Sequence, residues 1–145
     1  MKPQIVEVEK IRKLRHRVLR KGRPFTDTLY ERDNDKQTIH LAIIKREKTL
    51  TCATFYPEKT TEVKSKKAYR LRGMATDPFF RRKGYGRKIM KESFEILKKQ
   101  KCDVLWCNAR LVAVKFYLSL GFKKKGEIFN IKSIGPHYYM YKKIT

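Results

Sequence analysis

The sequence predicts an α/β domain in which strands and helices alternate along the chain. Residues 38–57 contain two β-rich runs joined by a polar turn at residues 46–48, which is the pattern of a hairpin. Residues 85–100 place their apolar side chains at helical spacing. A turn with glycines at residues 84–86 connects an alternating segment to this helix. Because both periodicities occur within one short chain, the sequence favours the α/β class.

The first part of the chain is expected to form a strand and then a helix. A short strand is predicted near residues 4–8. In the next segment, apolar side chains recur at helical spacing at Ile11, Leu14, Val18 and Leu19. Gly22 and Pro24 then end this helix. The hairpin of residues 38–57 follows, and Pro57 closes it.

The rest of the chain is expected to alternate in the same way. Residues 67–77 are predicted to form a strand with Tyr69, Leu71 and Gly73 on one face, and Pro78 stops it. The apolar stripe of the next helix is Ile89, Met90, Phe94 and Leu97. The remaining elements are a strand at 102–108, a helix at 111–120 ended by Gly121, and strands at 122–129 and 138–142. The predicted order is β-α-β-β-β-α-β-α-β-β.

Length and composition limit the possible architectures. The 145 residues suit a single domain, residues 1–145, and no repeat or linker divides them. The first residues lack the apolar core of a signal peptide and no apolar run is long enough to span a membrane, so we expect a soluble, cytoplasmic protein. Cys52, Cys102 and Cys107 lack paired spacing, so we expect buried thiols and neither disulfides nor a metal site.

The charge balance favours negatively charged partners. There are 37 Lys and Arg against 14 Asp and Glu, which gives a net charge of +23. This field attracts polyanions and disfavours strongly cationic ligands such as polyamines or aminoglycosides. Nucleic acid is therefore a possible partner. However, the basic residues are scattered along most of the chain, and scattered charge often only solubilises a surface.

The glycine turn has the features of a phosphate-binding loop. Gly84 and Gly86 lie at the start of a predicted helix, whose first N–H groups have no partner within the helix. A Walker loop would need Ser or Thr after Gly-Lys, but Arg87 and Lys88 follow Gly86. A dinucleotide fingerprint would need a third glycine where Ile89 stands. The alternative is an ordinary turn followed by a solvated, basic helix start.

Two sequence blocks decide in favour of the phosphate loop. Arg81-x-x-Gly84-x-Gly86, after a strand that ends in Asp-Pro, resembles the pyrophosphate loop of the GNAT superfamily of N-acetyltransferases. Residues 113–122 resemble the second signature of this family, Ala-x-x-Phe-Tyr-x-x-x-Gly-Phe. The resemblance is close over residues 68–122, and the element order of the remainder is compatible with the same fold.

The resemblance implies a particular form of the α/β class. This is the GNAT fold, a mixed and mostly antiparallel sheet that is flanked by helices and splayed between strands 4 and 5, where acetyl-CoA binds. Finer similarity is to the ElaA-like bacterial branch, which has a His on an early strand, as at His40, and a Pro-His pair before the last strand, as at Pro136 and His137.

The resemblance also implies which residues hold coenzyme A. Main-chain groups on the strand before the loop would pair with the pantetheine arm, amides of the loop would hold the pyrophosphate, and basic side chains would reach phosphates. The implied residues are Met74, Thr76, Arg81, Arg82, Lys83, Gly84, Tyr85, Gly86, Arg87 and Asn108.

Tyr117 is the implied general acid. It matches the family's tyrosine that protonates the departing thiolate, and a phenol stays protonated at neutral pH. The alternative is an aromatic helix residue that only packs in the core. In addition, Arg110 stands where the family often has Asn, so Asn108 would contact the cofactor instead.

The base and the acceptor are less well defined by the sequence. Four of the 14 acidic residues lie between the first helix and the second strand, namely Asp27, Glu31, Asp33 and Asp35. In this fold that region usually shapes the acceptor site, so Glu31 and Asp33 are candidates for the base or for acceptor binding. Ordinary loop solubility is the alternative. His40 and His137 have a pKa range suited to proton transfer, but each also suits a hydrogen-bonded strand position.

The function implied is transfer of an acetyl group from acetyl-CoA to a primary amine by direct attack. Acetyl-CoA would be a co-substrate, no metal would take part, and the acceptor would be a small molecule or a protein. Exposed strands near the C-terminus offer a route to pairing, so a monomer or a homodimer is expected. Two alternatives remain, a basic nucleic-acid-binding module and a protein of the same fold that binds coenzyme A without useful catalysis.

Overall fold

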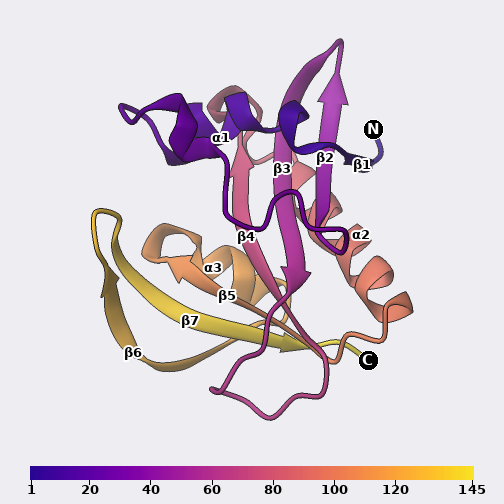
Figure 1. The fold of residues 1–145 in the computed structure, drawn as a ribbon, viewed down its shortest axis with the longest axis vertical. Helices are drawn as coiled ribbons and strands as arrows, with labels where there is room; N and C mark the ends of the chain where they lie inside the picture. The colour runs from indigo at the N-terminus through magenta and orange to yellow at the C-terminus, as the bar shows by residue number, and fades with distance from the viewer. The chain divides into compact units, whose positions relative to one another are not determined.

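The computed structural model describes the whole chain, Met1–Thr145, and its elements follow the predicted order (Figure 1). The strands are β1 Gln4–Val6, β2 Ile39–Lys45, β3 Lys48–Pro57, β4 Ala68–Thr76, β5 Val104–Arg110, β6 Lys123–Ile131 and β7 Gly135–Lys143. The α-helices are α1 Arg12–Leu19, α2 Tyr85–Lys99 and α3 Val114–Ser119. Short 3-10 helices are η1 Val8–Lys10, η2 Phe25–Thr28, η3 Pro78–Phe80 and η4 Leu111–Ala113.

The chain forms two compact units, and each unit is built from two separate stretches. Unit 1 consists of Met1–Tyr56 and Leu71–Glu95, and unit 2 consists of Pro57–Arg70 and Ile96–Thr145. Strand β4 and helix α2 each contribute residues to both units. The single domain 1–145 remains a prediction.

The fold class agrees with the prediction. Hydrogen-bonded strands follow the order β1-β2-β3-β4-β5-β7-β6. The β4–β5 pair is parallel and registers Ala68 with Val104, whereas the β1–β2, β2–β3, β5–β7 and β6–β7 pairs are antiparallel. The sheet is therefore mixed and mostly antiparallel, as expected. A parallel connection needs a crossover, and α2 lies between β4 and β5 in the chain.

In unit 1 the predicted hairpin forms with a tighter turn than expected. Lys45 pairs with Lys48, so the loop contains only Arg46 and Glu47. Both have positive φ, 50° and 66°, which matches the twist of a two-residue hairpin loop. The turn predicted at residues 46–48 is thus shorter by one residue, because Lys48 already belongs to β3.

The apolar core of unit 1 joins the N-terminal helices to the strands. Its buried members include Val8, Ile11, Leu14, Ala42, Cys52 and Ala75. Because Ile11 and Leu14 fall on the predicted stripe, the apolar periodicity of α1 correctly identified the face that packs on the sheet. No helix combines the length and the apolar composition needed to cross a membrane.

The core of unit 2 is aromatic. Its buried members are Ala68, Val104, Trp106 and Tyr139. The rings of Trp106 and Tyr139 stack with centroids 5.6 Å apart, and the Trp106 Nε1–H donates to the Glu58 carbonyl oxygen at 3.0 Å. At the end of α3, Gly121 has a φ of +94°, as the predicted glycine cap requires.

The edge strand β6 carries features that discourage pairing with another chain. It begins with three exposed lysines, Lys123, Lys124 and Lys125, and its register against β7 shifts between Lys125 and Phe129. Edge lysines and bulges are common protections against edge-to-edge association. The route to a homodimer through this strand is therefore not favoured, while the oligomeric state itself remains a prediction.

All three cysteines are free and buried, in agreement with the sequence analysis. Burial raises the pKa of Cys52 and Cys107 to about 12 each. The thiolate forms are therefore scarce at neutral pH, and these side chains act as small apolar groups.

A buried arginine organises the polar interior of unit 1. The side chain of Arg15 is fully buried, and its guanidinium contacts both carboxylate oxygens of Asp33 at 2.6 and 3.0 Å. Other guanidinium N–H groups donate to the Thr28 carbonyl oxygen at 2.8 Å and to the Thr54 hydroxyl at 2.7 Å. The guanidinium also lies 3.9 Å from the ring centroid of Tyr30. Helix α1 is thereby bound to the segment after η2 and to β3.

The hydrogen bonds of this cluster close a ring through His40. Since the Thr54 hydroxyl accepts from Arg15, its own O–H is available to donate to His40 Nδ1, 2.8 Å away. His40 Nε2 then donates to the Asp33 carbonyl oxygen at 2.9 Å. This arrangement needs a neutral imidazole. Burial indeed lowers the pKa of His40, although the Asp33 carbonyl and charge partly oppose this effect.

We predict that Asp33→Asn destabilises the protein by about 3–5 kcal/mol, because it leaves the Arg15 charge buried without a counter-ion. Urea unfolding of the two proteins measures this difference. Asp35→Asn is the matched control, since Asp35 pairs with Arg32 at 3.0 Å but both side chains are substantially exposed. The control should cost less than about 1 kcal/mol. Similar losses for both variants would contradict the central role of the buried pair.

Candidate functional site

The glycine loop lies in unit 1, between η3 and α2. Its segment is anchored by Asp77, whose N–H donates to the Leu50 carbonyl oxygen at 2.8 Å and whose side chain accepts from the Phe79 N–H at 3.0 Å. The Lys88 N–H donates to the Gly84 carbonyl oxygen at 3.1 Å. Gly84 therefore directly precedes α2 and accepts its first backbone hydrogen bond, so the amides of Tyr85 and Gly86 lie in the first turn, where a helix provides no backbone acceptor.

The backbone of the loop is bent by two residues of left-handed conformation. Arg82 has a φ of +62° and Gly84 a φ of +82°. Such a conformation is unfavourable for a non-glycine residue, and such residues are concentrated at functional sites. A Cβ added at Gly84 would meet no protein atom within 4 Å. The space over this glycine is open to a ligand.

The side chains around the loop are basic and exposed. They are Arg81, Arg82, Lys83 and Arg87. Tyr85 and Gly86, at the start of α2, are half-buried. A helix N-terminus with open amides and surrounding cations can hold a phosphate group.

The end of β4 leads into this loop. Met74 and Thr76 are half-buried, and the Thr76 hydroxyl lies 2.9 Å from that of Thr51. Thr51 also donates to the Ala75 carbonyl oxygen at 3.0 Å. Upstream, Gly73 has a φ of +64° within the strand, which bends β4 next to the predicted pantetheine residues.

The acidic residues between α1 and β2 are largely neutralised. The ion pairs are Asp27 with Arg23 at 2.9 Å, Asp33 with Arg15 at 2.6 Å and Asp35 with Arg32 at 3.0 Å. The region is consequently not the isolated patch of negative charge that its composition indicated.

Asp33 is the most constrained of these acidic residues. Its carboxylate is held by Arg15 and by the Tyr30 N–H at 2.6 Å, so it is occupied as an acceptor and is not placed to take a proton from an amine. Asp33 therefore supports the fold of unit 1, and its assignment to the base or to acceptor binding stays a prediction that these contacts weaken. Glu31 is exposed and stays a candidate for acceptor binding. His40 is likewise occupied at both ring nitrogens.

Tyr117 lies on α3 in unit 2. It is buried, and its ring packs against Phe116 and Phe122 with centroids 5.3 and 5.2 Å away. Burial raises the pKa of Tyr117 well above its usual value, so the phenol is protonated at neutral pH. This state suits a proton donor, and the packing equally suits a core residue.

The other candidates of unit 2 lie on β5 and β7. Asn108 is half-buried and pairs in register with Tyr139, while Arg110 pairs in register with His137. His137 is buried, its Nδ1 lies 2.8 Å from the Gly135 carbonyl oxygen, and its ring stacks on Phe129. Strand β7 begins at Gly135, earlier than the predicted residue 138, so His137 is a strand residue.

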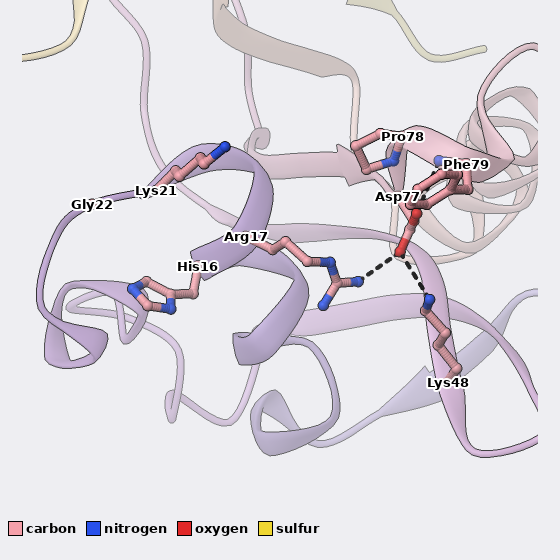
Figure 2. A pocket seen from close by; sticks show the side chains of 8 residues that line it. All are labelled: His16, Arg17, Lys21, Gly22, Lys48, Asp77, Pro78 and Phe79. Atoms are coloured by element: carbon pink, nitrogen blue, oxygen red, sulfur yellow. Dashed lines mark hydrogen bonds and ion pairs between the residues drawn. The ribbon is translucent and has the colours of Figure 1, made fainter.

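Sequence reasoning missed two polar clusters of unit 1. The first is the Arg15 cluster, and its signal was available: Arg15 stands four residues after Ile11 on the apolar stripe of α1. The second joins Arg17 and Lys48 to the buried Asp77 at 2.8 and 3.4 Å (Figure 2). No local pattern in the sequence indicated this cluster.

Asp77 is ionised in this cluster. Burial alone would raise its pKa, but the hydrogen bond from the Phe79 N–H and the bonds from Arg17 and Lys48 outweigh burial and lower the pKa below its usual value. The carboxylate thus remains negative at neutral pH and keeps both cations in place.

Comparison with known proteins gives a family. The chain matches the family described as Acetyltransferase (GNAT) family over residues 6–122. It is 34% identical over 137 residues to a protein of Bacillus subtilis (strain 168) named "Uncharacterized N-acetyltransferase YitI", and the match covers 94% of this chain and 92% of that protein.

Solved structures show the same fold. An aminoglycoside 6'-N-acetyltransferase complexed with coenzyme A has a TM-score of 0.79 at 11% identity, covering 100% of this chain and 98% of that one. Escherichia coli ElaA has a TM-score of 0.78 at 18% identity, covering 98% and 99%. ElaA is thus among the similar folds, as the sequence resemblance suggested.

The family match contains both the glycine loop and the Tyr117 helix, and it spans most of the chain. The relative from Bacillus subtilis covers nearly the whole length of both proteins. The chain therefore belongs to the GNAT family of acetyltransferases and is an acyltransferase.

Proposed function

We propose that the protein transfers the acetyl group of acetyl-CoA to a primary amine. The observation that carries this proposal is the loop before α2, where a left-handed glycine with open space above it, a helix N-terminus and exposed cations occur together. A protein of the same fold is known in complex with coenzyme A, which supports the choice of cofactor.

The proposed cofactor contacts follow the family pattern within this chain. Amides of residues 82–87 would hold the pyrophosphate, and the side chains of Arg81, Arg82, Lys83 and Arg87 would neutralise phosphate charge. Main-chain groups of Met74 and Thr76 would pair with the pantetheine arm. Asn108 would make a further contact from β5.

The proposed reaction is direct attack on the thioester. The nitrogen lone pair of the neutral amine forms a bond to the carbonyl carbon, and the carbonyl oxygen becomes an oxyanion that strand amides near Met74 and Ala75 would stabilise. The carbon–sulfur bond then breaks. The departing thiolate takes the proton of the Tyr117 phenol, and the new amide loses its extra proton to a base or to water.

Fewer residues remain as candidates for the general base and for contacts with the acceptor than the sequence analysis named. Glu31 is exposed in the segment between α1 and β2 and would orient or deprotonate the amine. His137 is retained as a weaker candidate, because its Nδ1 already lies within hydrogen-bonding distance of a carbonyl oxygen. A net charge of +23 disfavours strongly cationic acceptors.

An acceptor library with detection of free thiol tests the function. We expect acetyl-CoA consumption that depends on an added amine. We also expect Glu31→Gln to change the kinetics with the acceptor. The affinity for coenzyme A should stay within about 2-fold of the wild type, since Glu31 would contact only the acceptor. Tight coenzyme A binding without turnover across the library would favour the non-catalytic alternative. No binding and no turnover would reject the proposal.

We predict that Gly84→Val weakens coenzyme A binding by at least about 10-fold, because the side chain fills the space from which a phosphate would approach the amides. Isothermal calorimetry measures the change. Gly126→Val is a matched control: its φ is +80°, against +82° for Gly84, and neither position has an atom within 4 Å of an added Cβ. The control variant introduces the same kind of backbone strain away from the loop, so it shows how much of the loss in affinity is due to strain alone. Unaltered affinity in Gly84→Val would exclude the loop as the cradle.

We predict that Tyr117→Phe lowers kcat by roughly 10- to 10⁴-fold while the melting temperature changes little, because the ring is kept and the transferable proton is lost. Single-turnover kinetics ensure that the chemical step is observed. Tyr117→Ala provides the comparison, since truncating a buried aromatic residue should cost about 3–5 kcal/mol of stability. If Tyr117→Phe retains wild-type turnover, Tyr117 is a packing residue and water protonates the thiolate.

A further inference from the structure

A hollow in unit 1 is formed by residues that the proposed acetyl transfer does not use. Its volume is about 420 Å³, and it lies where the C-terminal part of α1, the first residue of β3 and the residues after β4 meet (Figure 2). The polar and aromatic side chains that matter here are Arg17, Lys21, Lys48, Asp77 and Phe79. A hollow of this size is within the range of small-molecule sites.

The lining of the hollow carries a positive charge. Three cations, Arg17, Lys21 and Lys48, stand against the single carboxylate of Asp77, which leaves two positive charges in excess. An anion that enters gains Coulomb energy from all three cations. A dianion would neutralise the excess, whereas a single carboxylate would neutralise only half of it.

Two of these cations are held in position before any ligand binds. Asp77 is buried and accepts from Arg17 at 2.8 Å and from Lys48 at 3.4 Å, and Figure 2 shows both side chains converging on it from different elements. The Arg17 and Lys48 side chains remain 45% and 52% exposed, so their other N–H groups can reach a ligand. Fixing these flexible side chains in advance lowers the entropy lost on binding.

The hollow also presents an aromatic surface. Phe79 is 84% exposed, and Pro78 beside it is also exposed. Its exposed ring offers a surface on which a flat base can stack. The site thus combines several cations with a stacking surface.

We propose that this hollow binds a nucleotide, with a phosphate group among Arg17, Lys21 and Lys48 and the base against Phe79. A phosphate monoester carries close to two negative charges at pH 7, which matches the excess charge of the lining. The guanidinium and ammonium groups donate charge-assisted hydrogen bonds to its oxygens. Binding of a free nucleotide here would be independent of the acetyl-transfer proposal, whereas binding of the adenosine end of coenzyme A would rest on it.

The nucleotide has two possible sources with the same chemistry. One is a free mononucleotide, and the other is the phosphorylated adenosine end of coenzyme A. Both present a phosphate monoester next to a purine. The experiment separates the two.

The first arm is an NMR titration with adenosine 5'-monophosphate, compared with adenosine, which lacks the phosphate. We expect amide shifts at the residues of the hollow. Lys21→Gln should weaken binding of the nucleotide by at least about 3-fold and leave adenosine unaffected, since one charge-assisted bond is lost. Phe79→Ser should weaken both by about 5-fold or more, because both stack on the ring.

These two variants avoid a folding defect. Lys21 takes no part in the ion pairs of Asp77, and Phe79 is outside the core. Lys13→Gln is the matched control: it removes the same charge from an exposed position on α1, which does not line the hollow. The control should change the nucleotide affinity by less than about 2-fold, as expected for a screened distant charge.

The second arm identifies the source. If coenzyme A supplies the phosphate, the protein should prefer coenzyme A to 3'-dephospho-coenzyme A, and Lys21→Gln should abolish that preference. If a free nucleotide is the ligand, adenosine 5'-monophosphate should still shift the hollow in protein saturated with coenzyme A. The proposal is overturned if the nucleotide does not bind, or if Lys21→Gln and Phe79→Ser bind it as the wild type does. A failure of coenzyme A to bind would count against the acetyl-transfer proposal alone.

Discussion

Unit 1 depends on the burial of one guanidinium group, that of Arg15. A charge without solvent contact is costly unless it is paired and its hydrogen bonds are satisfied. Asp33, Thr28 and Thr54 satisfy four of the donor contacts, and they come from three different parts of the chain. These partners therefore fix α1 against the segment after η2 and against β3. The contacts of the charged Arg15 guanidinium therefore hold the parts of this unit together.

The same cluster determines the course of β4. Arg15 Nε is buried without a hydrogen-bond partner, and an added Cβ at Gly73 would lie 3.2 Å from it and 3.1 Å from the Tyr30 ring. Gly73 also has a positive φ, so both its backbone and its surroundings require glycine. The bend of β4 is thus held in place directly before Met74, and the strand then continues to Asp77 and the glycine loop. The buried contacts of Arg15 and Tyr30, which are distant from the glycine loop in the sequence, therefore help to hold this loop in position.

The distribution of charge explains which ligands suit this protein. The acidic residues Asp27, Asp33, Asp35 and Asp77 are each engaged with arginine or lysine, so they orient cations more than they supply free negative charge. Basic side chains around the glycine loop and the hollow remain exposed. A field of this kind attracts phosphate-bearing molecules to both places. Coenzyme A and a nucleotide share that property.

The sequence by itself determined the features that depend on near neighbours in the chain. The element order, the hairpin, the loop of Gly84 and Gly86 and the cap at Gly121 all follow from periodicity and turn chemistry, which act over a few residues. The family blocks likewise placed Tyr117 on α3. Even where boundaries differ, as at Lys48 and Gly135, the type of element was predicted correctly.

Only the tertiary structure decided which charged groups meet. Arg15 and Asp33 are 18 residues apart, and Arg17 and Asp77 are 60 residues apart, so no local pattern pairs them. Composition made Asp33 resemble a free acid in a loop, whereas the fold buries it against a cation. Asp77 resembled the end of a strand, and the fold makes it the anchor of two cations. An ion pair forms where the path of the chain brings two side chains together, and burial then decides whether each group is available for chemistry or is consumed by the fold.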